Sequence, residues 1–318
     1  MALKISSGFV NRPQKVAMYG SEGIGKTKTA SRFPDPLFID TEGGTSHIDV
    51  KRTQKPADWN ELIEIIEDVA NTPDICKTLV IDTADWAEAL AIEDICTKMK
   101  VDSIESIAYG KGYSYVGQYF GKMLGSCDKV IASGKNVVIV AHAKMRKFEQ
   151  PDELGAYDRW EMKLTKQSAP LLKEWADMLL FLNYKTYVVA TDTASKKVQG
   201  GKRVMYATHH PCWDAKNRHN LPDEMEMDYK CIAHIFENVV TPKKEEPQVS
   251  KFYEQVRTLL VQSECTEEEL RRVVSQKGHF SYETEVKDYP DDFFEKWVIP
   301  NWPNIVSVIT TFTDHIPF

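Results

Sequence analysis

The sequence predicts an α/β fold in which a mostly parallel central sheet is flanked by helices. Short apolar segments of strand length alternate with longer segments whose apolar residues recur at helical spacing, the pattern of successive β-α units. The strand segments are apolar at nearly every position, as expected for strands that are buried on both faces of a parallel sheet. A length of 318 residues, 42% of them hydrophobic, allows one large core and a smaller additional unit.

The expected elements follow in chain order. Strands are predicted over residues 16–19, 37–40, 78–82, 136–141 and 178–183. Helices are predicted over residues 59–69, 86–99 and 115–132. From Thr186 the apolar period changes to two, which predicts a β-hairpin with strands 187–191 and 203–208 on either side of a Gly200–Gly201 turn.

Composition divides the chain into a core over residues 1–240, a polar linker over residues 241–250 and a small acidic α-rich module over residues 251–318. From Lys243 onward there are 9 Lys/Arg against 14 Asp/Glu, a net charge of −5 out of −7 for the whole chain. In this module a helix is predicted over residues 266–276, where Thr266 and Glu269 have the spacing of a capping box.

Several classes of protein are disfavoured. No segment approaches the roughly 20 apolar residues of a membrane span, and the first residues lack the apolar core of a signal peptide. Six cysteines without C-x-x-C pairs indicate reduced thiols, so we expect a cytoplasmic protein without a membrane partner. One scattered set could bind zinc, although its spacing matches no standard pattern: His209, His210, Cys212, Cys231 and His234. The alternative is a strand end and a loop, with Cys231 and His234 on an amphipathic helix.

A phosphate-binding motif follows the first predicted strand and precedes a helix. It reads Gly20-Ser21-Glu22-Gly23-Ile24-Gly25-Lys26-Thr27 and fits G-x-x-x-x-G-K-[ST], the P-loop of nucleoside triphosphate-binding proteins. Backbone N–H groups would hold the phosphates of ATP, Lys26 would neutralise the β- and γ-phosphates, and the Thr27 hydroxyl would ligate Mg²⁺. We count Thr29, in the following helix, among the nucleotide-binding residues.

Two acidic residues complete a hydrolytic site. Asp82 ends a buried apolar strand, where its carboxylate can hold the Mg²⁺ shell. Glu42 lies just past another strand end, in Asp40-Thr41-Glu42-Gly43-Gly44, where it can deprotonate the attacking water. The alternative for Glu42 is a surface charge on a loop.

This order of elements resembles the RecA-like ATPase core of bacterial and archaeal recombinases. The resemblance implies that Glu42 is the catalytic base. It also implies that His142, which ends the strand Val137-Val138-Ile139-Val140-Ala141, is a polar sensor of the γ-phosphate, at a position where recombinases usually carry Asn-Gln.

The same resemblance implies two DNA-binding loops. The first precedes the helix over residues 115–132 and contains Lys111 and Tyr113. The second follows His142 and contains Lys144, Arg146, Lys147, Arg159, Lys163 and Lys166, interleaved with Phe148, Tyr157 and Trp160. Cations can follow a phosphate backbone while aromatic rings stack on bases. The alternative is a solvated loop whose aromatic rings pack on the sheet.

A further element, Lys216-Asn217-Arg218, resembles the Lys-x-Arg element with which RadA-type proteins and DnaB-type helicases reach into the ATP site of a neighbouring subunit. It implies a homo-oligomer, a ring or a filament, in which Lys216 and Arg218 act in trans. Asn220 stands where those proteins have glycine. The alternative is an ordinary basic loop.

The body of the chain, about residues 12–240, resembles the ATP-binding RecA-core proteins of phage recombination gene clusters. We therefore expect a DNA-stimulated ATPase that binds single-stranded DNA and promotes annealing or strand exchange in a bacterial host cell, with the C-terminal module open to other recombination or replication proteins. A helicase-loader-like or partner-regulating ATPase is the alternative. A nucleotide kinase is disfavoured because the chain lacks an arginine-rich lid.

Overall fold

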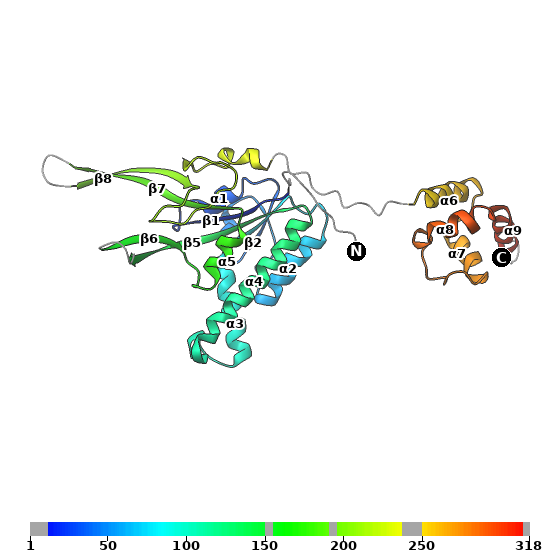
Figure 1. Ribbon diagram of the computed structural model, residues 1–318, viewed down its shortest axis with the longest axis horizontal. Helices are drawn as coiled ribbons and strands as arrows, with labels where there is room; N and C mark the ends of the chain where they lie inside the picture. The colour runs from blue at the N-terminus through cyan, green and yellow to red at the C-terminus, as the bar shows by residue number, and fades with distance from the viewer. Residues whose placement is uncertain (1–11, 150–154, 191–195, 237–249, 314–318) are drawn as a thin grey trace. The chain divides into compact units, whose positions relative to one another are not determined.

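The computed structural model describes residues 12–149, 155–190, 196–236 and 250–313. The protein consists of two compact units, Met1–Pro242 and Lys243–Phe318, each of which makes most of its contacts within itself. In Figure 1 the colour runs from blue at the N-terminus of the first unit to red at the C-terminus of the second. The predicted linker lies outside the described residues except for its last residue, Ser250, whose side chain caps the first helix of the second unit. In the described part of the chain, no helix is long and apolar enough to cross a membrane.

The first unit is built on one nine-stranded sheet with the order β3-β2-β4-β5-β1-β7-β8-β9, and β6 pairs with β5 beside this path. The parallel strands are β1 (Lys15–Gly20), β2 (Pro36–Asp40), β3 (Lys51–Arg52), β4 (Thr78–Asp82), β5 (Asn136–Glu149) and β7 (Met178–Ala190). The antiparallel strands are β6 (Ala156–Met162), β8 (Lys196–Tyr206) and β9 (Glu224–Glu226). This mixed, mostly parallel sheet confirms the predicted α/β fold class.

Helices cover both faces of the sheet, and each face has its own core. The helices of this unit are α1 (Lys26–Ala30), α2 (Trp59–Asn71), α3 (Ala84–Met99), α4 (Lys111–Ala132) and α5 (Ser168–Trp175). Helices α2 to α5 pack on the face that carries Ile39 and Ile81, and α1 packs on the face that carries Phe38 and Val80 (Figure 1). Successive side chains of a strand point to opposite faces, so strands covered on both sides are apolar throughout.

The strand register brings the polar strand ends together. Gly20 is aligned with His142 across β1 and β5, and Asp40 is aligned with Asp82 across β2 and β4. Asp82 is in turn aligned with Val140 of β5. The last residues of β1, β2 and β4 therefore lie level with His142, which is inside β5 because that strand continues to Glu149, and together they form a polar edge beside the phosphate loop.

The predicted Gly200–Gly201 turn is wrong. Strands β7 and β8 continue past it as a long antiparallel ribbon, with Thr186 aligned with Gly200 and Lys185 with Lys202. Gly201 is left over at this register shift and has a φ of 125°. A glycine with positive φ suits a β-bulge as well as a turn, which is why the sequence pattern misled. The chain between β7 and β8, residues 191–195, lies outside the described residues.

Two other segments differ from expectation. The predicted second DNA-binding loop is largely a β-ribbon, in which residues 143–149 of β5 pair with residues 156–162 of β6. The predicted helix around Cys231 is two short 3-10 turns, η4 (Tyr229–Cys231) and η5 (Ala233–Ile235). Aromatic contacts fix these turns, because Phe33 of the core packs against both Tyr229 and Phe236.

The second unit is helical, as predicted, and has a core of its own around Leu270 and Phe294. Its elements are α6 (Lys251–Gln262), α7 (Glu267–Gln276), a 3-10 turn (Val286–Asp288), α8 (Asp291–Phe293), a π turn (Phe294–Val298) and α9 (Trp302–Thr313). The predicted capping box is confirmed: Thr266 caps α7 and the Glu269 side chain bonds back to the Thr266 backbone.

Candidate active site

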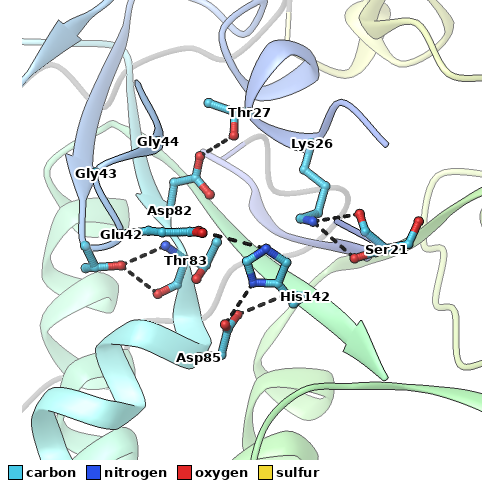
Figure 2. A network of polar contacts seen from close by, with 12 residues as sticks. Ser21, Lys26, Thr27, Glu42, Gly43, Gly44, Asp82, Thr83, Asp85 and His142 are labelled. Carbon is cyan, nitrogen blue, oxygen red and sulfur yellow. Dashed lines mark hydrogen bonds and ion pairs between the residues drawn. The ribbon is translucent and has the colours of Figure 1, made fainter. Parts of the chain in front are cut away.

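The phosphate loop connects β1 to α1 and depends on its glycines. A Cβ on Gly20 would lie 2.4 Å from the backbone oxygen of Leu182 on the neighbouring strand. Gly23 and Gly25 have φ values of 70° and 108°, a region that favours glycine. The Lys26 ammonium lies inside the loop and donates hydrogen bonds to the carbonyl oxygens of Gly20 at 3.1 Å and Ser21 at 3.0 Å (Figure 2). The loop therefore has the backbone shape and the cation that a phosphate chain requires.

Burial lowers the pKa of Lys26, and the nearby carboxylates, Asp82 first, oppose this shift. The lysine is 6% exposed, so its charge is held in a site largely closed to solvent. A cation in such a site interacts with a phosphate anion more strongly than a surface lysine does.

Thr27 and Asp82 form the candidate metal position. The Thr27 hydroxyl donates a 2.7 Å hydrogen bond to Oδ2 of Asp82, which is 5% exposed (Figure 2). Burial raises the pKa of Asp82 to about 6, against the opposing effects of the Thr27 hydrogen bond and the Lys26 charge. A hydroxyl and a buried carboxylate beside a phosphate loop are the hard oxygen ligands that Mg²⁺ prefers, so these residues fit the ion.

The loop that carries Glu42 is held by Asp40. Oδ1 of Asp40 accepts hydrogen bonds from the backbone N–H groups of Glu42, Gly43 and Gly44, at 3.2, 2.6 and 3.2 Å. Its Oδ2 accepts from the backbone N–H of Thr45 at 2.8 Å and from the Thr45 hydroxyl at 2.6 Å. Burial alone would raise the pKa of Asp40, but these hydrogen bonds outweigh it and lower the pKa.

Asp40 therefore serves to shape the turn, while the Glu42 side chain remains 40% exposed and faces the site. Thr41 connects the loop to Thr83, the residue after β4. Its hydroxyl donates to the carbonyl oxygen of Thr83 at 2.9 Å and accepts from the Thr83 N–H at 2.8 Å. The Glu42 carboxylate is thus left open to water on a loop that is held at both strand ends.

His142 is held by Asp85, a residue that the sequence reasoning missed. Nδ1 of His142 lies 2.9 Å from Oδ2 of Asp85, and the His142 backbone N–H donates to Oδ1 of Asp85 at 2.9 Å (Figure 2). Nε2 of His142 lies 3.9 Å from Oε2 of Glu42. Asp85 is only 7% exposed, and although burial alone would raise its pKa, the bonds to His142 lower it.

An Asp85 carboxylate at Nδ1 fixes the proton of a neutral imidazole on Nδ1 and leaves the other nitrogen, Nε2, unprotonated on the side of Glu42. The signal for Asp85 is its place in the first turn of α3, directly after the strand that ends in Asp82.

The structure brings together Lys26, Thr27, Glu42, Asp82 and His142. The remaining motif residues contribute backbone or packing: Ile24 is fully buried in the core, and Ser21 is half-buried and bonds Lys26 through its carbonyl. Glu22 is exposed. The Thr29 hydroxyl donates to the Gly25 carbonyl at 3.1 Å, so the structure directs it into the helix instead of the phosphate loop.

Lys216 and Arg218 lie at the opposite edge of the sheet from the phosphate loop of their own chain. The Lys216 backbone pairs with Leu179 at the start of β7, and its ammonium donates to the carbonyl oxygens of Lys173 and Glu174. The Arg218 guanidinium lies 2.9 Å from Asp177, the residue that precedes β7. Asn220, which stands where the RadA-type proteins have glycine, has a left-handed φ of 54°.

The predicted DNA-binding residues divide into free and engaged groups. Lys111, Lys147, Lys163 and Lys166 are exposed. Arg146 is half-exposed and 3.9 Å from Glu161, and the Lys144 ammonium donates to the Leu164 carbonyl at 2.9 Å. The Tyr113 hydroxyl donates to Glu105 at 3.2 Å.

Arg159 differs most from the expectation for a DNA-binding residue. Its side chain is 12% exposed and lies 2.5 Å from Asp214, and it also donates to the Pro211 carbonyl at 2.8 Å. Its charge is therefore neutralised within the chain. Among the aromatic residues of the ribbon, Trp160 packs against the core of the sheet, as the alternative to DNA binding expects. Phe148 instead contacts Tyr157 on the ribbon itself.

The five zinc-capable residues do not converge. Within the described ranges, no three His, Cys, Asp or Glu side chains form a group that could hold a metal ion. The His210 ring instead stacks on Trp213 at 4.1 Å, and its Nδ1 accepts the backbone N–H of Cys212.

Parts of the chain are similar to known proteins. The chain is 24% identical over 132 residues to the SPbeta prophage-derived uncharacterized protein YorG of Bacillus subtilis (strain 168), a match that spans 40% of each protein. The flagellar accessory protein FlaH from Methanocaldococcus jannaschii is a weak structural likeness, with a TM-score of 0.33 and 10% identity over 62% of this chain and 78% of that one. Residues 12–219 match the AAA domain family. The chain therefore belongs to the AAA domain family and carries a P-loop ATPase domain.

Proposed function

We propose that the protein binds and hydrolyses Mg-ATP, and that it binds single-stranded DNA as an oligomer in support of phage DNA recombination or annealing. The observation that carries the ATPase proposal is the arrangement at one sheet edge of a buried cation, a hydroxyl–carboxylate pair and an open carboxylate. These are Lys26, the pair Thr27–Asp82, and Glu42 with Oε2 3.9 Å from Nε2 of His142. Each is a group that phosphoryl transfer to water requires.

In the proposed mechanism the Lys26 ammonium leaves the carbonyl oxygens of Gly20 and Ser21 and pairs with the phosphates. Thr27 and Asp82 would hold Mg²⁺, which would neutralise charge on the phosphate oxygens. Glu42 orients the attacking water and takes its proton, because its carboxylate is exposed on a loop that Asp40 keeps in place. His142 faces the same space and is held in one orientation by Asp85.

Phosphate release from ATP tests this proposal. Lys26→Ala is expected to abolish ATP binding and turnover, because nothing else in the loop supplies a buried cation. Glu64→Gln is the matched control, since Glu64 is exposed on α2 away from the sheet edge. Phosphate release by Lys26→Ala at the rate of the Glu64→Gln control would refute the ATPase proposal.

The DNA part of the proposal is supported by the β5–β6 ribbon. The first strand of this ribbon is the continuation of β5 beyond His142, and it exposes Arg146 and Lys147. Lys163, directly after β6, is also exposed. In Figure 1 the β5–β6 and β7–β8 ribbons project from the same end of the sheet. Exposed cations beside the aromatic pair Phe148–Tyr157 suit the phosphates and bases of a single strand.

Stimulation of ATP hydrolysis by single-stranded DNA tests the ribbon. The double variant Lys147→Ala/Lys163→Ala should lose stimulation and low-salt DNA retention, because phosphate contacts are strongest at low salt. Lys122→Ala, an exposed lysine on α4, is the control. Equal stimulation in both variants would refute a role for the ribbon.

The oligomer is supported by the position of Lys216 and Arg218. They lie beside the start of β7, whereas the phosphate loop of their own chain follows the end of β1. The Arg218 side chain is 57% exposed and so accessible to a second copy. Arg218→Ala should lower turnover with little change in ATP affinity. A mixture of the Arg218→Ala and Lys26→Ala proteins should recover part of the turnover, because Arg218 of a Lys26→Ala subunit can reach the intact phosphate loop of an Arg218→Ala subunit. No recovery in the mixture would count against action in trans.

A partner-regulated ATPase is the second candidate, because most of the net negative charge of the chain, −5 of −7, lies in a unit with its own core. Deletion of residues 243–318 separates the two. DNA-stimulated turnover should survive the deletion if DNA binding is central, whereas the second candidate requires that the deletion abolish its regulation by a partner.

A further inference from the structure

An arginine of the β7–β8 ribbon lies against the phosphate loop. If Gly25 carried a Cβ, Nη1 of Arg203 would be 3.2 Å from it and Cζ would be 4.0 Å away. The Met227 methyl carbon approaches the same point to 3.2 Å. The Arg203 guanidinium thus occupies the space that a side chain at Gly25 would need, beside the motif that holds phosphates, although the two residues are 178 positions apart in sequence.

The strand register places Arg203 there. Leu182 of β7 is aligned with Gly20 of β1 and with Met205 of β8. Leu182 and Met205 lie in the same core cluster as Ile24 of the phosphate loop, so their side chains are on the face of the sheet that α1 covers. Tyr184 and Arg203 are the next aligned pair on that face, because side chains alternate along each strand. They come just after β1 has ended.

The charge of Arg203 has no acidic partner among the described residues. Its side chain is exposed and lies over the ring of Tyr184, with Cζ 5.9 Å from the ring centroid. Two other cations of the ribbon do have carboxylates: Lys202 lies 3.7 Å from Glu226 and Lys185 lies 2.5 Å from Glu224. A guanidinium that lies against an aromatic ring keeps its N–H donors free for a phosphate or carboxylate group.

We propose that Arg203, oriented by Tyr184, binds the α- or β-phosphate of the nucleoside di- or triphosphate held by the phosphate loop. In this motif backbone N–H groups hold the α- and β-phosphates, and the lysine reaches the β- and γ-phosphates. Arg203 approaches the loop at Gly25 from β8, whereas His142 on β5 and the Glu42 loop after β2 lie on the other side of β1. We therefore place Arg203 at the part of the nucleotide that ATP and ADP share, away from the γ-phosphate. The inference rests on the proposed ATP binding and adds a binding residue that lies outside the motif.

Calorimetric titration of the full chain with ATP and with ADP tests the proposal. Arg203→Ala is expected to weaken binding of ATP and of ADP by the same factor, about tenfold or more, because one charge-assisted contact to a shared phosphate is lost. Arg203→Lys should recover part of the affinity. Lys202→Ala is the matched control, because Lys202 is the preceding residue on the opposite face and should leave both affinities unchanged.

Three results would overturn the inference: wild-type affinities in Arg203→Ala, a loss for ATP alone, which would place the arginine at the γ-phosphate, or an equal loss in Lys202→Ala. Thermal melting of each variant separates a binding defect from unfolding. A failure of the ATPase proposal is distinguishable, because then the wild-type protein itself would not bind ATP or Lys26→Ala would bind it normally.

Discussion

Replacement of Asp85 by Asn should slow ATP turnover without weakening ATP binding. The Asp85 carboxylate accepts both from the His142 backbone N–H and from His142 Nδ1, each at 2.9 Å. A carboxamide can keep its oxygen on the backbone N–H only by turning its NH₂ toward Nδ1. The imidazole must then carry its proton on Nε2, where it would donate to Glu42 and compete with the attacking water.

The size of this effect follows from the charge-assisted hydrogen bond that His142 Nδ1 donates to the Asp85 carboxylate, which the carboxamide replaces with a neutral bond in the opposite direction. A hydrogen bond to a charged group contributes about 1.5–3 kcal/mol. At roughly 1.4 kcal/mol per tenfold in rate, its complete loss from the transition state would lower kcat by about 10- to 100-fold. KM for ATP should change much less, because Asp85 does not touch the phosphate loop.

Steady-state phosphate release at several ATP concentrations measures kcat and KM separately. The control is Asp94→Asn, which removes the same charge from the same helix, where Asp94 pairs with Lys98 on the surface. Wild-type kcat in Asp85→Asn, or an equal loss in Asp94→Asn, would refute a positioning role. A melting temperature below the assay temperature would instead mean that the variant fails to fold.

Three further predictions concern stability and the loop. Burial raises the pKa of Asp82 from its ordinary value of 3.8 to about 6, so the folded protein favours the protonated carboxyl. The contribution of this group to stability is fully present below pH 3.8 and is lost as the pH rises through about 6. Asp82→Asn should therefore raise the melting temperature of the nucleotide-free protein at pH 8 but not at pH 3.5, and an equal shift at both would contradict the pKa. Gly20→Ala should destabilise by about 1–3 kcal/mol, because its Cβ would meet the Leu182 carbonyl at 2.4 Å, and a neutral result in denaturant unfolding would contradict the close approach. Gly125→Ala, in open space on α4, should instead stabilise the helix by about 0.5–1 kcal/mol in the same assay, and a loss would count against its exposed helical position.

Local sequence pattern was sufficient for the strands and the phosphate loop. Buried parallel strands are apolar at every position, so β1, β2 and β4 could be located, and their closing residues Gly20, Asp40 and Asp82 could be placed at one edge. The motif gave Lys26 and Thr27 directly, because its spacing is tied to the shape of the loop.

Contacts between distant segments could not be predicted in this way. Asp85 lies 57 residues from His142 and Arg203 approaches Gly25 only through the pairing of β7 with β1, so neither has a local signal. Gly201 is the opposite case: its local sequence predicts a turn, but in the fold it forms a β-bulge within β8. Arg159 was predicted as a free cation, but Asp214, 55 residues away, pairs with it.

The measurement that tests the hydrolytic site most directly is a comparison of ATP binding and single-turnover phosphate release in Glu42→Gln. Glu42 lies outside the phosphate loop, is 40% exposed, and is held by Asp40 at the edge where Lys26 and Asp82 meet. Removal of its charge should leave ATP affinity within a few-fold of the wild type and lower the rate of hydrolysis by about 100-fold or more, as expected for a lost general base. Hydrolysis at the wild-type rate in Glu42→Gln would contradict its role as the base.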